Sequence, residues 1–87
     1  MISLPVIDYS RFTKAQQVKK IGEEYGEVCE ALLNDDPEEV IRESLDCIQT
    51  HWTLINMVVT EHGMTLDIFF EEHCQKLKDK GYLAQEG

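Results

Sequence analysis

Residues 37–62 have the pattern of one long helix whose apolar positions are not confined to one side. Between Ile48 and Val59 the apolar positions occupy most of the circumference at about 100° per residue. A domain of 87 residues buries only roughly 60% of the surface that its unfolded chain exposes, so one small neighbour cannot cover this helix. The sequence therefore predicts that this helix lies at the centre of a homo-oligomer, either a dimer or a tetramer.

Capping residues mark the ends of the predicted helices. Asp36 has the chemistry of an N-cap, Pro37 suits the first helical position, and Glu39 completes a capping box. Gly63 and Gly81 are expected to end the second and third helices, because glycine adopts the left-handed conformation at low cost. We therefore expect helices over about residues 11–33, 37–62 and 66–80.

These boundaries predict an all-α fold. Its elements are a helix hairpin and a third helix, with a four-helix-bundle-like core that oligomerisation completes. We expect a single domain over residues 1–87, in which 1–9 form a leader and 83–87 a loose tail.

The first helix is expected to carry acids beside an apolar stripe. The stripe consists of Val18, Ile21, Tyr25, Val28, Cys29 and Leu32. Glu24 and Glu27 lie along its edge together with Lys20, whereas Glu23 and Glu30 are expected to point toward water.

Two carboxylate pairs suggest a metal site. Glu24 and Glu27 are three residues apart, as are Glu43 and Asp46, so each pair shares one helical face. A single pair of this kind in an acidic protein is ordinarily a solvated helix flank. Two pairs that face each other across an antiparallel hairpin would repel strongly unless a cation lay between them. Their ligands are all hard oxygens, which suit Mg²⁺, with Mn²⁺ as a substitute.

Composition excludes several classes of partner. The formal net charge of −9, from 8 basic and 17 acidic residues, disfavours binding to nucleic acid polymers and to anionic membranes. No apolar run approaches the roughly 18 residues of a membrane span. Three widely spaced cysteines indicate neither a zinc ribbon nor a disulfide framework, and a reducing cytoplasm is the expected location.

The paired acidic motif resembles a known family. The run over residues 21–32, followed by Glu43 and Asp46 after a short acidic turn, is similar to the EExxE and ExxD signature of MazG-like all-α nucleotide pyrophosphohydrolases. Relatives of that family include dimeric dUTPases and phosphoribosyl-ATP pyrophosphohydrolases. Residues 73–82 also resemble the lysine and arginine segment that closes many small phage-type members. One departure is Lys80, where an arginine is common, which puts bidentate phosphate contact at that position in doubt.

The resemblance implies a reaction and a ligand set. Mg²⁺ would be bound by Glu24, Glu27, Glu43 and Asp46. The substrate would be a nucleoside triphosphate, cleaved between its α and β phosphates to the monophosphate and pyrophosphate.

Physical chemistry supports the same roles. A carboxylate-bound Mg²⁺ neutralises phosphate charge and acidifies a water molecule, while Glu24 or Glu27 is the candidate base that accepts the water proton. Lys20, Lys76 and Lys80 are candidate substrate-binding residues that would neutralise the phosphate tail. Lysines near a helix C-terminus are equally favoured by the helix dipole, so Lys76 and Lys80 have a structural alternative.

Two other functions stay open from the sequence. One is a noncatalytic acidic helical oligomer that acts as an adaptor or regulatory subunit. The other is a hydrolase of the same fold with another pyrophosphate-linked substrate, such as phosphoribosyl-ATP.

Overall fold

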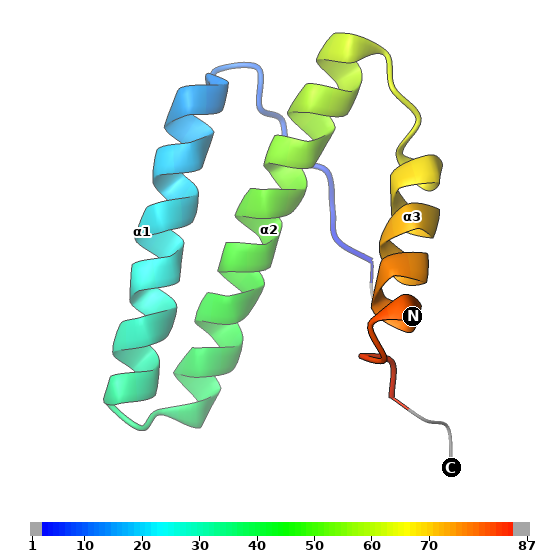
Figure 1. The fold of residues 1–87 in the computed structure, drawn as a ribbon. Helices are drawn as coiled ribbons and strands as arrows, with labels where there is room; N and C mark the ends of the chain where they lie inside the picture. The colour runs from blue at the N-terminus through cyan, green and yellow to red at the C-terminus, as the bar shows by residue number, and fades with distance from the viewer. Residues whose placement is uncertain (1–2, 85–87) are drawn as a thin grey trace.

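The computed structural model describes residues 3–84, which form three helices. These are α1 (Lys14–Leu33), α2 (Pro37–His62) and α3 (Leu66–Asp79), and residues 3–84 contain no strand. Figure 1 shows α1 and α2 side by side as an antiparallel hairpin, with α3 on the opposite side of α2. The all-α prediction and the hairpin are thereby confirmed. Of the expected leader and tail, residues 1–2 and 85–87 lie outside the described part.

The start of α2 follows its capping residues. The Asp36 Oδ1 accepts a hydrogen bond of 3.1 Å from the Glu39 backbone N–H, and Pro37 occupies the first turn. The second hydrogen bond of the expected capping box, from the Asp36 N–H to the Glu39 side chain, does not form, because both groups have other partners. The Asp36 N–H donates to the Ala31 carbonyl at 3.2 Å, and the Glu39 carboxylate instead pairs with Arg42 at 2.7 Å.

The start of α1 differs from the expected residue 11, because Thr13 caps this helix. The Thr13 Oγ1 accepts from the Gln16 N–H at 3.1 Å, and the Gln16 Oε1 accepts from the Thr13 N–H at 2.8 Å. This is a complete capping box, which stops the helix from extending toward the N-terminus. At the other ends, Gly63 and Gly81 have φ values of 60° and 71°, as their expected stop roles require.

The contact surface between α1 and α2 is more polar than we expected from the apolar stripe on the first helix. The buried side chains of the described residues are Ala31, Met57, Gln17, Thr50 and Thr53. Val18, Tyr25 and Leu32 of the predicted stripe are instead 56%, 63% and 68% exposed. The stripe is wider than the strip of α1 that α2 can cover, so one edge of it stays open to solvent in the single chain.

The outer side of α2 carries a second uncovered stripe. Ile41, Leu45, Ile48 and Ile55 are 62%, 50%, 49% and 40% exposed, and they recur at spacings of three, four and seven residues. Such spacing is typical of a seam between packed helices.

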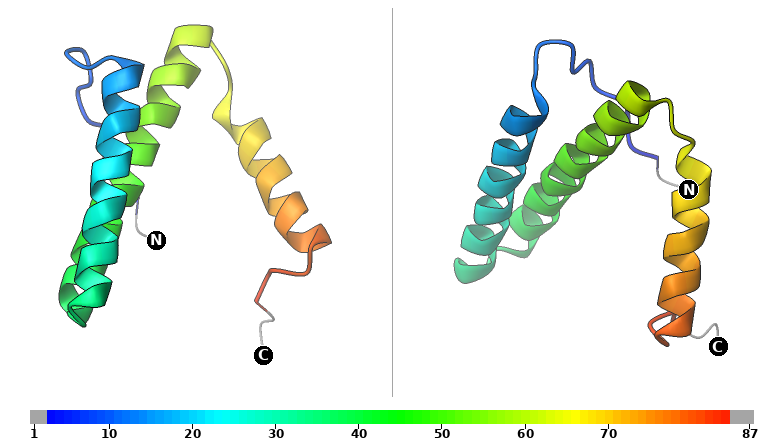
Figure 2. Two further views of the ribbon diagram at one scale, coloured as in Figure 1. Left: turned by 60° about the vertical axis from the view of Figure 1, so that its left-hand side comes forward. Right: turned by 45° about the horizontal axis from the view of Figure 1, so that its top comes forward.

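Helix α3 diverges from the hairpin and leaves an apolar groove. Trp52 of α2 and Phe70 of α3 stack with ring centroids 6.5 Å apart. The two helices lie near each other at the connection between them and separate toward the C-terminal end of α3 (Figure 2). The groove is lined by Leu54, Ile55, Val58, Val59, Met64, Leu66 and Phe69.

The single chain exposes more surface than a compact protein of its size. Its accessible area is 7288 Å², against about 5,300 Å² expected for a folded monomer of this mass. Its radius of gyration is 15.4 Å, against about 12 Å for a compact chain of this length. The excess of about 2,000 Å² exceeds the roughly 800 Å² that one partner contributes to a standard interface. The predicted oligomer stays a prediction, and these areas are consistent with it.

None of the three described helices combines the length and the apolar character that crossing a bilayer requires.

Candidate metal centre

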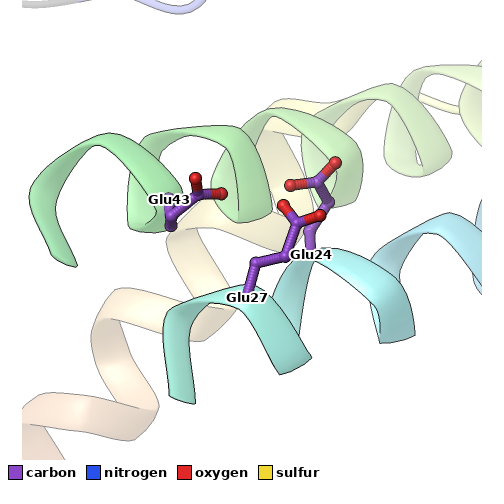
Figure 3. A group of neighbouring side chains, drawn as sticks. All are labelled: Glu24, Glu27 and Glu43. Atoms are coloured by element: carbon purple, nitrogen blue, oxygen red, sulfur yellow. The ribbon is translucent and has the colours of Figure 1, made fainter. Parts of the chain in front are cut away.

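Three of the four predicted carboxylate ligands meet between α1 and α2. Each of Glu24, Glu27 and Glu43 places a carboxylate oxygen within 4.8 Å of the other two. Figure 3 shows the three side chains converging, two from α1 and one from α2.

The hairpin connection explains this convergence. Asp35, with φ 52°, lies in the turn between the two helices. Glu27 and Glu43 are each eight residues from Asp35, and Glu24 and Asp46 are each eleven residues from it. Because antiparallel helices with equal rise bring equidistant residues to the same level, the two acidic pairs come to lie opposite each other.

The carboxyl groups resist ionisation together. A hydrogen bond with Glu27, followed by desolvation and by the charges of Glu27 and Asp46, raises the pKa of Glu43 to about 7. Desolvation, with Glu27 as the next cause, also raises the pKa of Glu24. Lys20 lies 3.9 Å from the Glu24 carboxylate and acts in the opposite direction, without reversing the shift in pKa. This mutual repulsion is what a bound cation would relieve.

The residues fit a hard divalent cation. The Oε2 atoms of Glu24 and Glu43 are buried and have no hydrogen-bond partner. Buried carboxylate oxygens without partners are costly, and coordination to a cation would satisfy them. Because the cluster contains oxygen donors alone, it suits Mg²⁺ or Mn²⁺ better than a thiophilic metal.

Asp46 lies beside the cluster of three. Its charge contributes to raising the pKa values of both Glu24 and Glu43. It lines a pocket of about 300 Å³ together with Glu24 and Lys20. The two helices thus bring Lys20 and all four acids to one region.

Lys76 and Lys80 lie elsewhere in the single chain. Lys76 is in the last turn of α3 and Lys80 is the C-cap residue, where its backbone N–H donates to the Lys76 carbonyl at 3.1 Å. Helix α3 lies across α2 from α1, and neither lysine lines the two pockets that border the acids (Figure 1). Their predicted contact with phosphate therefore has no support from the fold of one chain.

The pocket beside Asp46 contains residues outside the predicted set of site residues. They are Ile7, Phe12, Gln17, Gln49, Thr50 and Thr53. A signal for three of them was present: Gln17 precedes Glu24 by seven residues, and Thr50 and Thr53 follow Glu43 and Asp46 by seven. Seven residues are two helical turns, so these polar side chains continue the same faces as the acids.

A second pocket of about 220 Å³ lies on the side of the cluster nearer the hairpin turn. It is strongly acidic, since it is lined by Glu27, Glu30, Asp36, Glu39 and Glu43 with Ala31 and Asn34. Glu30 is exposed, as expected, but it borders this pocket instead of pointing away from the site.

The comparisons with known proteins identify the family. The phosphoribosyl-ATP pyrophosphohydrolase family matches residues 5–79, a span that includes all three helices and the four acids but not Lys80. No curated protein and no solved structure matches the chain significantly. The family is one of the relatives that the sequence motif suggested, and its match extends over most of the 87 residues. This chain, with its carboxylate cluster in a helical hairpin, belongs to the phosphoribosyl-ATP pyrophosphohydrolase family.

Proposed function

We propose that the protein is a Mg²⁺-dependent, MazG-like pyrophosphohydrolase. It would cleave a nucleoside triphosphate between the α and β phosphates, giving the nucleoside monophosphate and pyrophosphate. The observation that carries this proposal is the cluster of Glu24, Glu27 and Glu43 oxygens within 4.8 Å of one another. Membership of a pyrophosphohydrolase family supports the reaction class.

The four carboxylates and Lys20 would have different roles in this reaction. Mg²⁺, when bound, would neutralise charge on the phosphates and lower the pKa of a water molecule. Glu24, Glu27, Glu43 and Asp46 would hold the cation. Glu24 or Glu27 would also accept the proton of the attacking water, since both face the shared space between the helices. Lys20, whose Nζ lies 3.9 Å from the Glu24 carboxylate, would pair with a phosphate oxygen.

Phosphoribosyl-ATP is a second candidate substrate, favoured by the family match. It carries the same triphosphate, so the carboxylate cluster would serve both substrates equally. They differ at the base, which in phosphoribosyl-ATP carries an additional ribose phosphate.

The proposed enzyme is a homodimer or homotetramer. Its interface would bury the stripe of Ile41, Leu45, Ile48 and Ile55, which the single chain leaves exposed. Lys76 and Lys80 would reach a phosphate only if the assembly brought α3 of one copy to the acids of another.

Product analysis tests the proposed reaction. Wild-type protein with Mg²⁺ would be incubated with canonical and damaged nucleoside triphosphates and with phosphoribosyl-ATP, and the products separated by ion-exchange chromatography. We expect monophosphate and pyrophosphate in equal amounts. Diphosphate with orthophosphate would refute cleavage at the α–β bond. No product from any substrate, in a folded oligomer that also fails to bind Mg²⁺, would favour a noncatalytic adaptor.

A further inference from the structure

Helix α3 has little support from its own chain. None of its 14 residues is buried, and only Leu66 and Leu77 are partly buried. The hairpin of α1 and α2 accounts for nearly all of the packing between helices in the described chain, and Thr65 makes no side-chain capping hydrogen bond to α3. Isolated helices of this length are marginal in water, because tertiary packing supplies most of the stability of a helix. Helix α3 therefore needs a surface that one chain does not provide.

The groove between α2 and α3 has the chemistry of a protein contact. Its volume is about 500 Å³, larger than either pocket that borders the acids, and all of its lining side chains are apolar. Small-molecule sites combine apolar walls with a few polar groups that fix the orientation of the ligand. Because no polar side chain from the described residues lines this groove, it fits an apolar helix face better than a small polar ligand.

Helix α3 itself carries an apolar surface that matches the groove. Ile68, Phe69 and Phe70, near its start, are 56%, 48% and 49% exposed. In a two-fold dimer the same patches meet in both directions, so α3 of each copy can enter the groove of the other. Such an exchange brings α2 and α3 of both copies together as four packed helices, while α1 lies on the other side of α2 (Figure 1).

Surface area and charge favour a second copy as the occupant. The accessible surface exceeds that of a folded monomer of this mass by about 2,000 Å², and one partner of a standard interface contributes roughly 800 Å². Ile55 belongs both to the groove and to the exposed stripe of α2, so one partner can cover the two surfaces as a continuous interface. A basic partner protein would be attracted by acidic side chains, and none from the described residues lines the groove.

We propose that α3 of a second copy fills the groove between α2 and α3, reciprocally in both copies, and that this contact stabilises α3. The inference deepens the proposed assembly, because it names the helices that pack and makes the folding of α3 depend on association. It does not depend on the proposed reaction.

The test measures assembly and the stability of α3 separately. Sedimentation equilibrium gives the mass and the dissociation constant, and hydrogen exchange followed by mass spectrometry gives the protection of residues 66–79. The groove variants are Val59→Lys and Phe69→Ala. The matched control Thr60→Lys introduces the same charge one residue later on α2, at an exposed position that does not line the groove. Hydrogen exchange in residues 14–62 reports whether the hairpin of each variant stays folded.

Wild type and Thr60→Lys should sediment as a multiple of 10.1 kDa with α3 protected. Val59→Lys should raise the dissociation constant at least about tenfold, because an unpaired charge would enter an apolar contact. Phe69→Ala should act in the same direction, since it removes an aromatic side chain from the groove. In both groove variants the protection of α3 should be lost in the monomer, while the hairpin stays protected.

Three results would overturn the inference. They are a wild-type monomer, an assembly that Val59→Lys and Phe69→Ala leave as tight as that of Thr60→Lys, and an α3 that stays protected in a monomeric variant. The last result would mean that α3 closes onto the groove of its own chain. Pyrophosphate release separates this inference from the proposed function: an active wild-type monomer would refute the groove contact alone, whereas an assembly that behaves as expected here but releases no pyrophosphate would refute the reaction alone.

Discussion

The proton held by Glu43 makes a quantitative prediction about metal affinity. Without a cation, the hydrogen bond with Glu27, desolvation and neighbouring charges raise the pKa of Glu43 to about 7. A metal ligand must be deprotonated, so Mg²⁺ competes with this proton. At pH 6 roughly one tenth of such groups are ionised, and at pH 8 roughly nine tenths. If this one proton dominates, the affinity for Mg²⁺ should increase roughly tenfold between these pH values.

Isothermal titration with MgCl₂ measures this effect directly. Titrations at pH 6, 7 and 8, each in two buffers of different ionisation enthalpy, give both the dissociation constant and the number of protons released. At pH 6 we expect close to one proton released per ion from Glu43, and fewer at pH 8, with any additional release coming from Glu24, whose pKa is also raised.

Two variants decide whether the proton belongs to the cluster. Glu43→Gln should bind Mg²⁺ more weakly and lose most of the dependence on pH. Glu38→Gln, on the same helix but exposed and paired with Arg42, should behave like wild type. A pH-independent affinity in wild type, or an unchanged pH dependence in Glu43→Gln, would refute the argument that these carboxylates share protons at a cation site.

Three further predictions follow from the same geometry. Because the pKa of Glu43 is raised in the folded state, its favourable contribution to folding is present below about pH 4.5 and is lost as pH increases through about 7. The melting temperature of the metal-free protein should therefore fall over that range, and Mg²⁺ should restore it. Melting temperatures that do not change with pH would contradict this prediction. Ile48→Lys should reduce the mass measured by light scattering from a multiple of 10.1 kDa to 10.1 kDa, whereas Val6→Lys should not, and a wild-type monomer would exclude the proposed interface. Asp36→Ala removes the side-chain cap of α2 and should lower the free energy of unfolding by about 1 kcal/mol in urea titrations; no change would mean that water replaces the cap without loss.

The fold could be predicted from the sequence where local chemistry determines it. Asp36 and Pro37 start a helix by satisfying or omitting backbone N–H groups, and Gly63 and Gly81 end helices through positive φ. The start of α1 was misplaced although its signal, Thr13 followed by Gln16, is of the same kind. The capping box of Thr13 and Gln16 makes α1 begin at Lys14, three residues after the expected start.

The acids could be placed because the hairpin is nearly symmetric about its turn. Equal distances of eight and eleven residues from Asp35 bring the two pairs to common levels without any knowledge of packing. The polar pocket could not be found in this way. Ile7 and Phe12 reach it through the path of the N-terminal segment, which depends on long-range hydrogen bonds such as that from Gln49 to the Pro5 carbonyl.

The direction of the apolar faces was the less predictable part. Periodicity shows that α1 and α2 each have wide apolar surfaces, but it does not say which part the partner helix covers. In the structure the seam receives Gln17, Thr50 and Thr53, while Val18 and Ile48 stay outside. A chain that buries polar groups within its hairpin and exposes apolar groups outside it has the pattern expected of a subunit with an internal binding site.

Initial rates of pyrophosphate release test the central claim most directly. The assay compares wild type, Glu43→Gln and Glu38→Gln on a panel of nucleoside triphosphates and phosphoribosyl-ATP, with Mg²⁺ or with EDTA, after circular dichroism has shown equal helicity. We predict release by wild type and Glu38→Gln that requires Mg²⁺, and loss of release in Glu43→Gln. Release that persists in EDTA, or a folded Glu43→Gln as active as wild type, would contradict the assignment of this carboxylate cluster as a metal-dependent pyrophosphohydrolase site.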